Sequence, residues 1–143
     1  MNLLATIVSV FLVATLTANA AVFETYDKLV ERYGKPVKEL EFKKPVTKAY
    51  EFHKDKFRIA ARFLGDVVGH ERFSLVEGGE LKKQEIGRIL AANAANFKWS
   101  FDKNINRWVR SDNNAFARED EDHTAVYVWT TQWKAAHKIE KSL

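Results

Sequence analysis

The feature that most constrains the fold is the alternation of apolar and polar side chains within short segments between residues 48 and 75. The first two such segments are Lys48–His53, with Tyr50 and Phe52, and Lys56–Leu64, with Phe57, Ile59, Ala61 and Phe63. Successive side chains of a strand point to opposite faces, so this period predicts antiparallel strands that share one apolar face. A turn at Lys54-Asp55 would place Phe52 opposite Phe57 on that face.

The next turn can be chosen by the register that it would impose. A two-residue loop at Gly65-Asp66 would set Ile59 against Arg72. A three-residue loop, Gly65–Val67, instead sets Ile59 against Phe73. A shift by one residue would turn the whole strand inside out, so we expect the three-residue loop.

Two segments have the apolar period of a helix. In Leu81–Phe97 the stripe includes Ile86 and Ile89, and Glu85 occupies the acidic position of a capping box. A shorter amphipathic segment from Phe23 ends at Tyr33, where Gly34 and Pro36 stop it. Four more strands are expected after the longer helix: Phe97–Phe101, Asn106–Ser111, Asn114–Glu119 and Thr124–Thr131. The last of these is apolar on both faces, which suits a central position.

This order of elements predicts one α+β domain, with an antiparallel sheet of short strands and two helices packed on one face. The tail from Gln132 to Leu143 is compatible with a short helix or with a frayed end.

The first twenty residues carry no charged side chain, and their apolar core is followed by Ala18-Asn19-Ala20. That pattern predicts a signal peptide over residues 1–20, a mature domain over residues 21–143, and export to the periplasm or the extracellular space. The alternative is a retained anchor, although the apolar run is shorter than the roughly 20 residues that a membrane span needs. The chain has no cysteine, which favours a bacterial envelope over an animal extracellular fluid.

The formal net charge of +4 belongs entirely to the expected mature domain. After export we expect no nucleic acid as a partner. An envelope protein, an anionic polymer or a lipid head group is a more suitable one. The four histidines have no metal-binding spacing, and no nucleophile, phosphate-loop or dinucleotide motif occurs, so we expect no metal, no cofactor and no catalytic residue.

The candidate binding site is a basic face of the strands. With the three-residue loop, the face opposite Phe57 and Phe73 carries Arg58, Arg62, His70 and Arg72. Three arginines suit a phosphate or carboxylate ligand, and Glu51 alone cannot neutralise them. The other interpretation is a solvated face. A second surface hypothesis concerns the four tryptophans, which all lie in the last third of the chain and either fill the core or form a stacking platform.

Three short motifs also carry a resemblance. They are Arg32-Tyr33-Gly34-Lys35-Pro36, the segment from Glu85-Ile86 to Asn93, and Trp108-Val109-Arg110-Ser111-Asp112. Together they resemble a group of small exported bacterial proteins to which no activity is assigned. More distantly, a helix ending at Gly-x-Pro before a meander is similar to BamE-type lipoproteins of the outer-membrane assembly machinery, whose lipidated cysteine this chain lacks.

From these features we expect a non-catalytic exported module that binds a ligand or partner in the bacterial envelope. The alternative is a small enzyme acting on an envelope polymer or a secreted substrate. The two differ in the surface that they require: converging polar groups in a deep pocket for the enzyme, and a shallow basic or aromatic patch for the module. A structural subunit would instead expose an apolar face.

Overall fold

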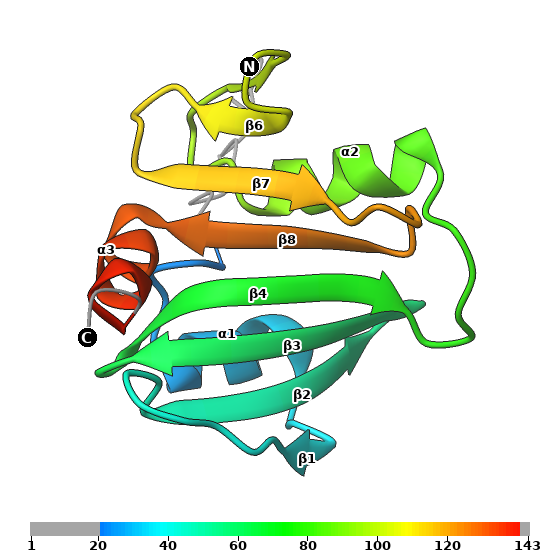
Figure 1. Cartoon of the computed structure of the whole chain (residues 1–143). Helices are drawn as coiled ribbons and strands as arrows, with labels where there is room; N and C mark the ends of the chain where they lie inside the picture. Colours follow the sequence, from blue (N-terminus) through cyan, green and yellow to red (C-terminus); the bar gives the residue numbers. More distant parts are fainter. Residues whose placement is uncertain (1–20, 141–143) are drawn as a thin grey trace, which may run out of the picture.

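The computed structural model describes residues 21–140, and the predicted signal peptide lies outside the described residues. The alternating segments form one antiparallel sheet of eight strands in the order β1-β2-β3-β4-β8-β7-β6-β5 (Figure 1). The strands are β1 (Lys38–Glu39), β2 (Lys48–Lys54), β3 (Phe57–Leu64), β4 (Val67–Leu75), β5 (Trp99–Asp102), β6 (Arg107–Arg110), β7 (Ala115–Glu119) and β8 (Ala125–Thr130). Strands β1 to β4 and strands β5 to β8 are therefore two consecutive meanders, joined where β4 pairs with β8.

The first hairpin turns one residue later than predicted. Lys54 pairs with Phe57, so the turn is Asp55-Lys56. Phe52 consequently faces Ile59 rather than Phe57. The shift is two residues along the partner strand, so the apolar face is the expected one.

The predicted register of the second hairpin is confirmed, but it arises from a β-bulge and not from the predicted three-residue loop. Ile59 faces Phe73, as expected. The loop, however, is the two-residue turn Gly65-Asp66, because Leu64 pairs directly with Val67. The register then shifts by one residue at a β-bulge, where Gly69 has no partner on β3. An extra residue in the strand has the same effect on register as an extra residue in the loop.

Three helices accompany the sheet: α1 (Tyr26–Tyr33), α2 (Lys83–Ala92) and α3 (Thr131–Glu140). Helix α2 begins where the capping pattern places it, and the Glu85 carboxylate accepts the Lys82 backbone N–H at 2.6 Å. It ends before the expected Phe97, because Ala95 and Asn96 have φ of 50° and 66°, outside the helical region.

The prediction of a sheet of short strands with two helices on one face is wrong. All eight strands join into one continuous sheet, and a third helix, α3, lies on the face opposite α1 and α2 (Figure 1). The sequence of the tail after Gln132 has no clear helical or strand period. The contact that places α3 on the second face, between the rings of Trp133 and His70 of β4, joins residues that are far apart in the sequence. The first face holds the core: Leu29 of α1 and Ile89 of α2 pack with Phe52, Ile59 and Val128 of the sheet.

One carboxyl group is buried within this core. Glu71 of β4 has no exposed surface. Its Oε1 accepts the Tyr33 hydroxyl at 3.3 Å, and its Oε2 has no hydrogen-bond partner among the described residues. Burial raises the pKa of Glu71 from 4.5 to about 8. The side chain is therefore mainly protonated at neutral pH.

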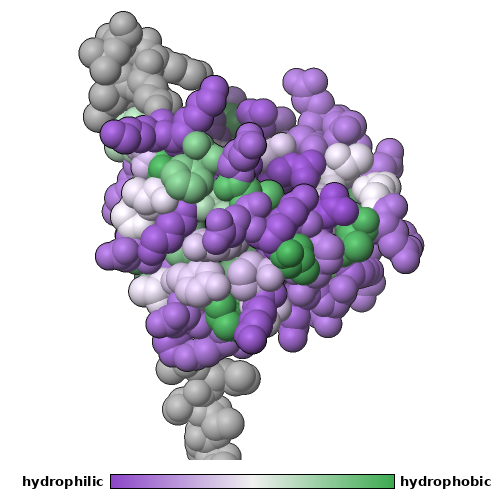
Figure 2. All heavy atoms as spheres, turned by 90° about the horizontal axis from the view of Figure 1, so that it is seen from below, coloured by the Kyte–Doolittle hydropathy of each residue, from purple (hydrophilic) through white to green (hydrophobic). Residues whose placement is uncertain are grey.

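No helix in the described part of the chain is long and apolar enough to cross a membrane. Seen from the β1 side, the surface is mainly hydrophilic, with a few separate apolar spots (Figure 2). The largest exposed apolar side chains are also dispersed, from Val37 and Phe42 near β1 to Phe101 and Ile105 at the other end of the sheet.

Candidate functional site

The second face of the sheet carries two neighbouring rows of side chains that run across the strands. In the first row, Arg72 of β4 pairs with Tyr127 of β8, and Tyr127 pairs with Arg118 of β7. The second row, one step along the strands, runs from Arg62 of β3 through His70 and Trp129 to Phe116, each paired with the next. Alternation within each strand places these residues opposite the core.

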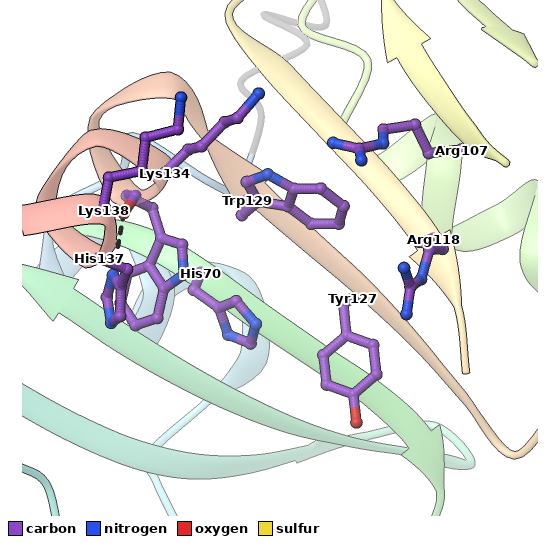
Figure 3. Close-up of a pocket in the computed structure, with 9 residues that line it drawn as sticks. His70, Arg107, Arg118, Tyr127, Trp129, Lys134, His137 and Lys138 are labelled. Carbon is purple, nitrogen blue, oxygen red and sulfur yellow. Dashed lines mark hydrogen bonds between the residues drawn. The ribbon is translucent and has the colours of Figure 1, made fainter. Parts of the chain in front are cut away.

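A groove of about 380 Å³ lies over these rows (Figure 3). Its floor is β8, which contributes Tyr127 and Trp129. Helix α3 forms one side with Lys134 and Lys138, while Arg107 of β6 and Arg118 of β7 form the other. The remaining lining residues are His70, Trp133 and His137. None of these nine described residues is acidic, so the groove carries positive charge on both sides of an aromatic floor.

A contact between aromatic rings holds α3 against the sheet. The His70 ring lies 4.7 Å from that of Trp133, and the Trp133 ring lies 4.0 Å from that of His137, centroid to centroid. His137 Nδ1 also lies 2.9 Å from the Trp133 carbonyl oxygen. The bulge residue Gly69 leaves the necessary space, because a Cβ there would stand 3.1 Å from Cε3 of Trp133.

His70 belongs to this packing and adds no charge. Burial, and next the nearby Arg62 and His137, lower the pKa of His70 to about 3. The ring is therefore neutral at neutral pH, and its Nδ1 has no hydrogen-bond partner among the described residues. Of the four residues predicted for the basic face, His70 is the one that lines the groove, and it shapes the groove without adding charge.

The arginines of the chain divide into two equal groups. Four of them form an ion pair with a carboxylate: Arg32 with Glu24, Arg58 with Glu51, Arg88 with Asp55 and Arg110 with Asp112. In the described residues, the other four have no carboxylate within ion-pair distance, and all lie on the second face: Arg62, Arg72, Arg107 and Arg118. The arginines that have no carboxylate partner among the described residues thus lie on the face that carries the groove.

Their contacts with the protein are with rings and neutral groups. Arg107 lies 5.7 Å from the Trp129 ring centroid, and Arg72 lies 5.8 Å from that of Tyr127. The Arg72 Nε also donates to the Tyr127 hydroxyl at 3.3 Å. Burial, and then the like charge of Arg72, lower the pKa of Arg62. A bound anion would relieve this repulsion between cations.

The predicted site residues are therefore divided. Arg62, His70 and Arg72 lie together beside the groove, with Arg62 directly opposite His70 and Arg72 on the next row. Arg58 shares their face, but its Nε lies 3.4 Å from Glu51 Oε1 and its Nη2 donates to the Val76 carbonyl oxygen. Anion binding by Arg62 and Arg72 stays a prediction, and Arg58 is the member that is already neutralised.

Sequence reasoning missed the basic residues that line the groove, namely Arg107, Arg118, Lys134, His137 and Lys138. The aromatic lining residues Tyr127, Trp129 and Trp133 belong to the concentration of aromatic residues in the last third of the chain, for which a stacking platform was one of two interpretations. Two of the four tryptophans, Trp99 and Trp108, pack against the core, whereas Trp129 and Trp133 line the groove. The two interpretations of the tryptophans therefore apply to different residues.

The groove offers cations and ring faces and, among its nine residues, no serine, threonine or carboxylate. Arginine binds carboxylates and phosphates with two parallel hydrogen bonds, and exposed rings pack against flat apolar surfaces. Within residues 21–140, no cluster of three His, Asp or Glu side chains could hold a metal ion. The chemistry available here is the recognition of an anion that carries a flat group.

The chain matches no protein-family model, and no curated protein matches its sequence. Among solved structures, it is similar to a cysteine-rich secretory protein from Staphylococcus aureus, with a TM-score of 0.47 and 11% sequence identity. The similarity covers 80% of this chain and 46% of that protein, so the chain spans less than half of that protein's length. No structural or functional conclusion follows from a similarity at this level.

Proposed function

We propose that the protein is a non-catalytic binding module of the bacterial envelope and that its groove binds an anionic ligand. The observation that supports this is the division of the arginines. Four are neutralised by carboxylates, and the four without such partners gather on one face, around one groove. Unneutralised like charges repel one another, so a bound anion would stabilise this arrangement.

Export is the other part of the proposal. It is supported by the apolar, uncharged residues 1–20 and the small residues Ala18 and Ala20 that end them. Outside the cytoplasm, the anions that such a protein meets are envelope polymers and lipid head groups. The groove is open and has cations on both sides, so it can accept a group from a larger molecule.

The test is a salt-dependent titration with a matched control. The purified protein would be titrated with inorganic polyphosphate at low and at physiological salt, beside an Arg72/Arg107/Arg118→Gln variant. The control variant carries Lys35/Lys43/Lys103→Gln, which removes the same charge from exposed lysines elsewhere. Comparing these two variants separates loss of the groove from loss of net charge.

We expect the arginine variant to bind roughly 100-fold more weakly at low salt, which corresponds to about 1 kcal/mol for each lost contact. The control should bind within a few-fold of the original protein. Affinity for the original protein should fall as salt rises, because salt screens exposed charges. Equal weakening by the two variants would place the binding outside the groove, and no binding at low salt would refute the proposal.

A further inference from the structure

The cations extend well beyond one side of the groove. Arg62 is on β3, Arg72 on β4, Arg118 on β7 and Arg107 on β6, and β8 lies between β4 and β7. From β3 to β6 there are four strand spacings of about 4.8 Å, or roughly 19 Å in all. A single phosphate or carboxylate can contact only part of such a track. A chain with a charge on each unit can contact all of it.

Aromatic rings interrupt this track at its centre. Tyr127 lies between Arg72 and Arg118 in the first row, and Trp129 lies next to His70 in the second. Figure 3 shows both rings on the floor, with the lysines of α3 on one side and Arg107 and Arg118 on the other. A ligand that crosses the groove must therefore present an apolar surface to the floor and charges to the two sides.

Sugar rings with acidic substituents meet both requirements. A pyranose has a face of C–H groups that packs against an indole or phenol ring, while a carboxylate projects from its edge. A lipid head group or inorganic polyphosphate supplies charge without a flat apolar face. Single-stranded nucleic acid supplies charge and flat bases. It is disfavoured here because residues 1–20 predict export.

We propose that the groove binds an acidic polysaccharide, whose ring stacks on Trp129 while its carboxylates pair with Arg72 and Arg118 on the strands and with Lys134 on α3. This inference rests on the proposed function and adds the chemical class of the ligand. It predicts that affinity depends on a ring as well as on charge. Trp129 is the residue that separates the two contributions.

The experiment compares polygalacturonate with inorganic polyphosphate of the same number of charges, each titrated calorimetrically into the purified protein. We expect polygalacturonate to bind at least tenfold more tightly. Trp129→Leu should remove that advantage, measured as the ratio of the two affinities, whereas Trp129→Phe should keep part of it. Circular dichroism and thermal unfolding would show that both variants are folded, and the comparison of polymers on the original protein needs no variant.

Each failure has a distinct meaning. Equal affinity for the two polymers would refute the polysaccharide inference and leave anion binding intact. Tighter binding of a single-stranded oligonucleotide than of polygalacturonate would refute it in favour of nucleic acid. If neither acidic polymer bound at low salt, the proposed function would fall and the inference with it.

Discussion

The buried Glu71 should make the protein lose stability as the pH rises above neutrality, and Glu71→Gln should remove that loss. The side chain lies in the core, with one oxygen bonded to Tyr33 and the other without a partner in the described structure. An unpaired carboxylate there would be costly, so the folded protein keeps the group protonated. Glutamine has nearly the same shape and cannot ionise.

The size of the effect follows from the pKa of Glu71, which is about 8 in the folded protein and 4.5 for the ordinary group. Between these values the folded state holds a proton that the unfolded state has released, so stability falls as the pH rises. Each unit corresponds to about 1.4 kcal/mol while the folded state keeps the proton, and the loss diminishes as Glu71 ionises near pH 8, so the total from pH 6.5 to pH 8.5 is about 2 kcal/mol.

Two histidines also make stability depend on pH, and they determine the pH range in which the effect of Glu71 can be measured. His70, with its pKa lowered to about 3 by burial, has the opposite sign: below pH 6.5 protonation favours the unfolded state, so stability rises with pH from about 3 to 6.5. Above pH 6.5 this contribution is complete. The exposed His123, whose pKa is raised by its hydrogen bond to Glu119, has the same sign as Glu71. A His123→Gln background removes that overlap.

The assay is urea unfolding of the His123→Gln protein at half-unit steps from pH 6.5 to 8.5, with and without Glu71→Gln. A Glu77→Gln variant is the control, because Glu77 is an exposed carboxylate. The His123→Gln protein and the control should lose about 2 kcal/mol across this range, and the Glu71→Gln protein should stay level. Parallel curves for all three would show that Glu71 does not exchange its proton on unfolding, and the reasoning would be wrong.

Three further predictions concern the core, the bulge and export. Ile89→Ala should cost about 2–5 kcal/mol by opening a cavity, against about 0.5 kcal/mol or less for the exposed Arg88→Ala; equal costs in urea unfolding would mean that the apolar stripe of α2 is misassigned. Gly69→Ala should lower the free energy of unfolding by about 1–3 kcal/mol, because the added Cβ would press on Trp133. It should also weaken binding in the groove, because α3 would pack less closely on the sheet. An unchanged melting temperature would contradict this prediction. Intact-mass analysis of protein exported from a bacterial host should give a chain that begins at Ala21, whereas full-length chain in the membrane fraction would favour the anchored alternative.

The part of the fold that could be predicted is the part encoded over short distances. Alternation in β3 and β4 determines which side chains face the core, so Ile59 and Phe73 were paired correctly. The same pattern could not show where the extra residue of β4 lies. An extra residue in the loop at Val67 and an extra residue in the strand at Gly69 give the same pairing of Ile59 with Phe73. The bulge residue Gly69 packs against Trp133, which is distant in sequence.

The groove could not be predicted because it depends on the pairing of β4 with β8. That pair brings His70 beside Trp129 and Arg72 beside Tyr127. Neither segment identifies its partner: β8 is apolar on both faces, and the apolar residues of β4 would fit several neighbouring strands. The sequence therefore predicted the basic face only within the first meander. Its continuation to Arg118 on β7 follows only from the order of the strands in the sheet.

The seam between the two meanders also determines when the groove can exist during folding. Within each meander, consecutive strands are joined by short turns, so their pairing closes small loops. Pairing β4 with β8 closes a much longer loop and carries a larger entropic cost, so we expect it to be a late step. The groove spans that seam, with His70 on β4 beside Trp129 on β8, and a ligand bound across it would bind only the closed sheet. Occupancy of the groove would thus slow unfolding, tying the lifetime of the folded state to the supply of ligand.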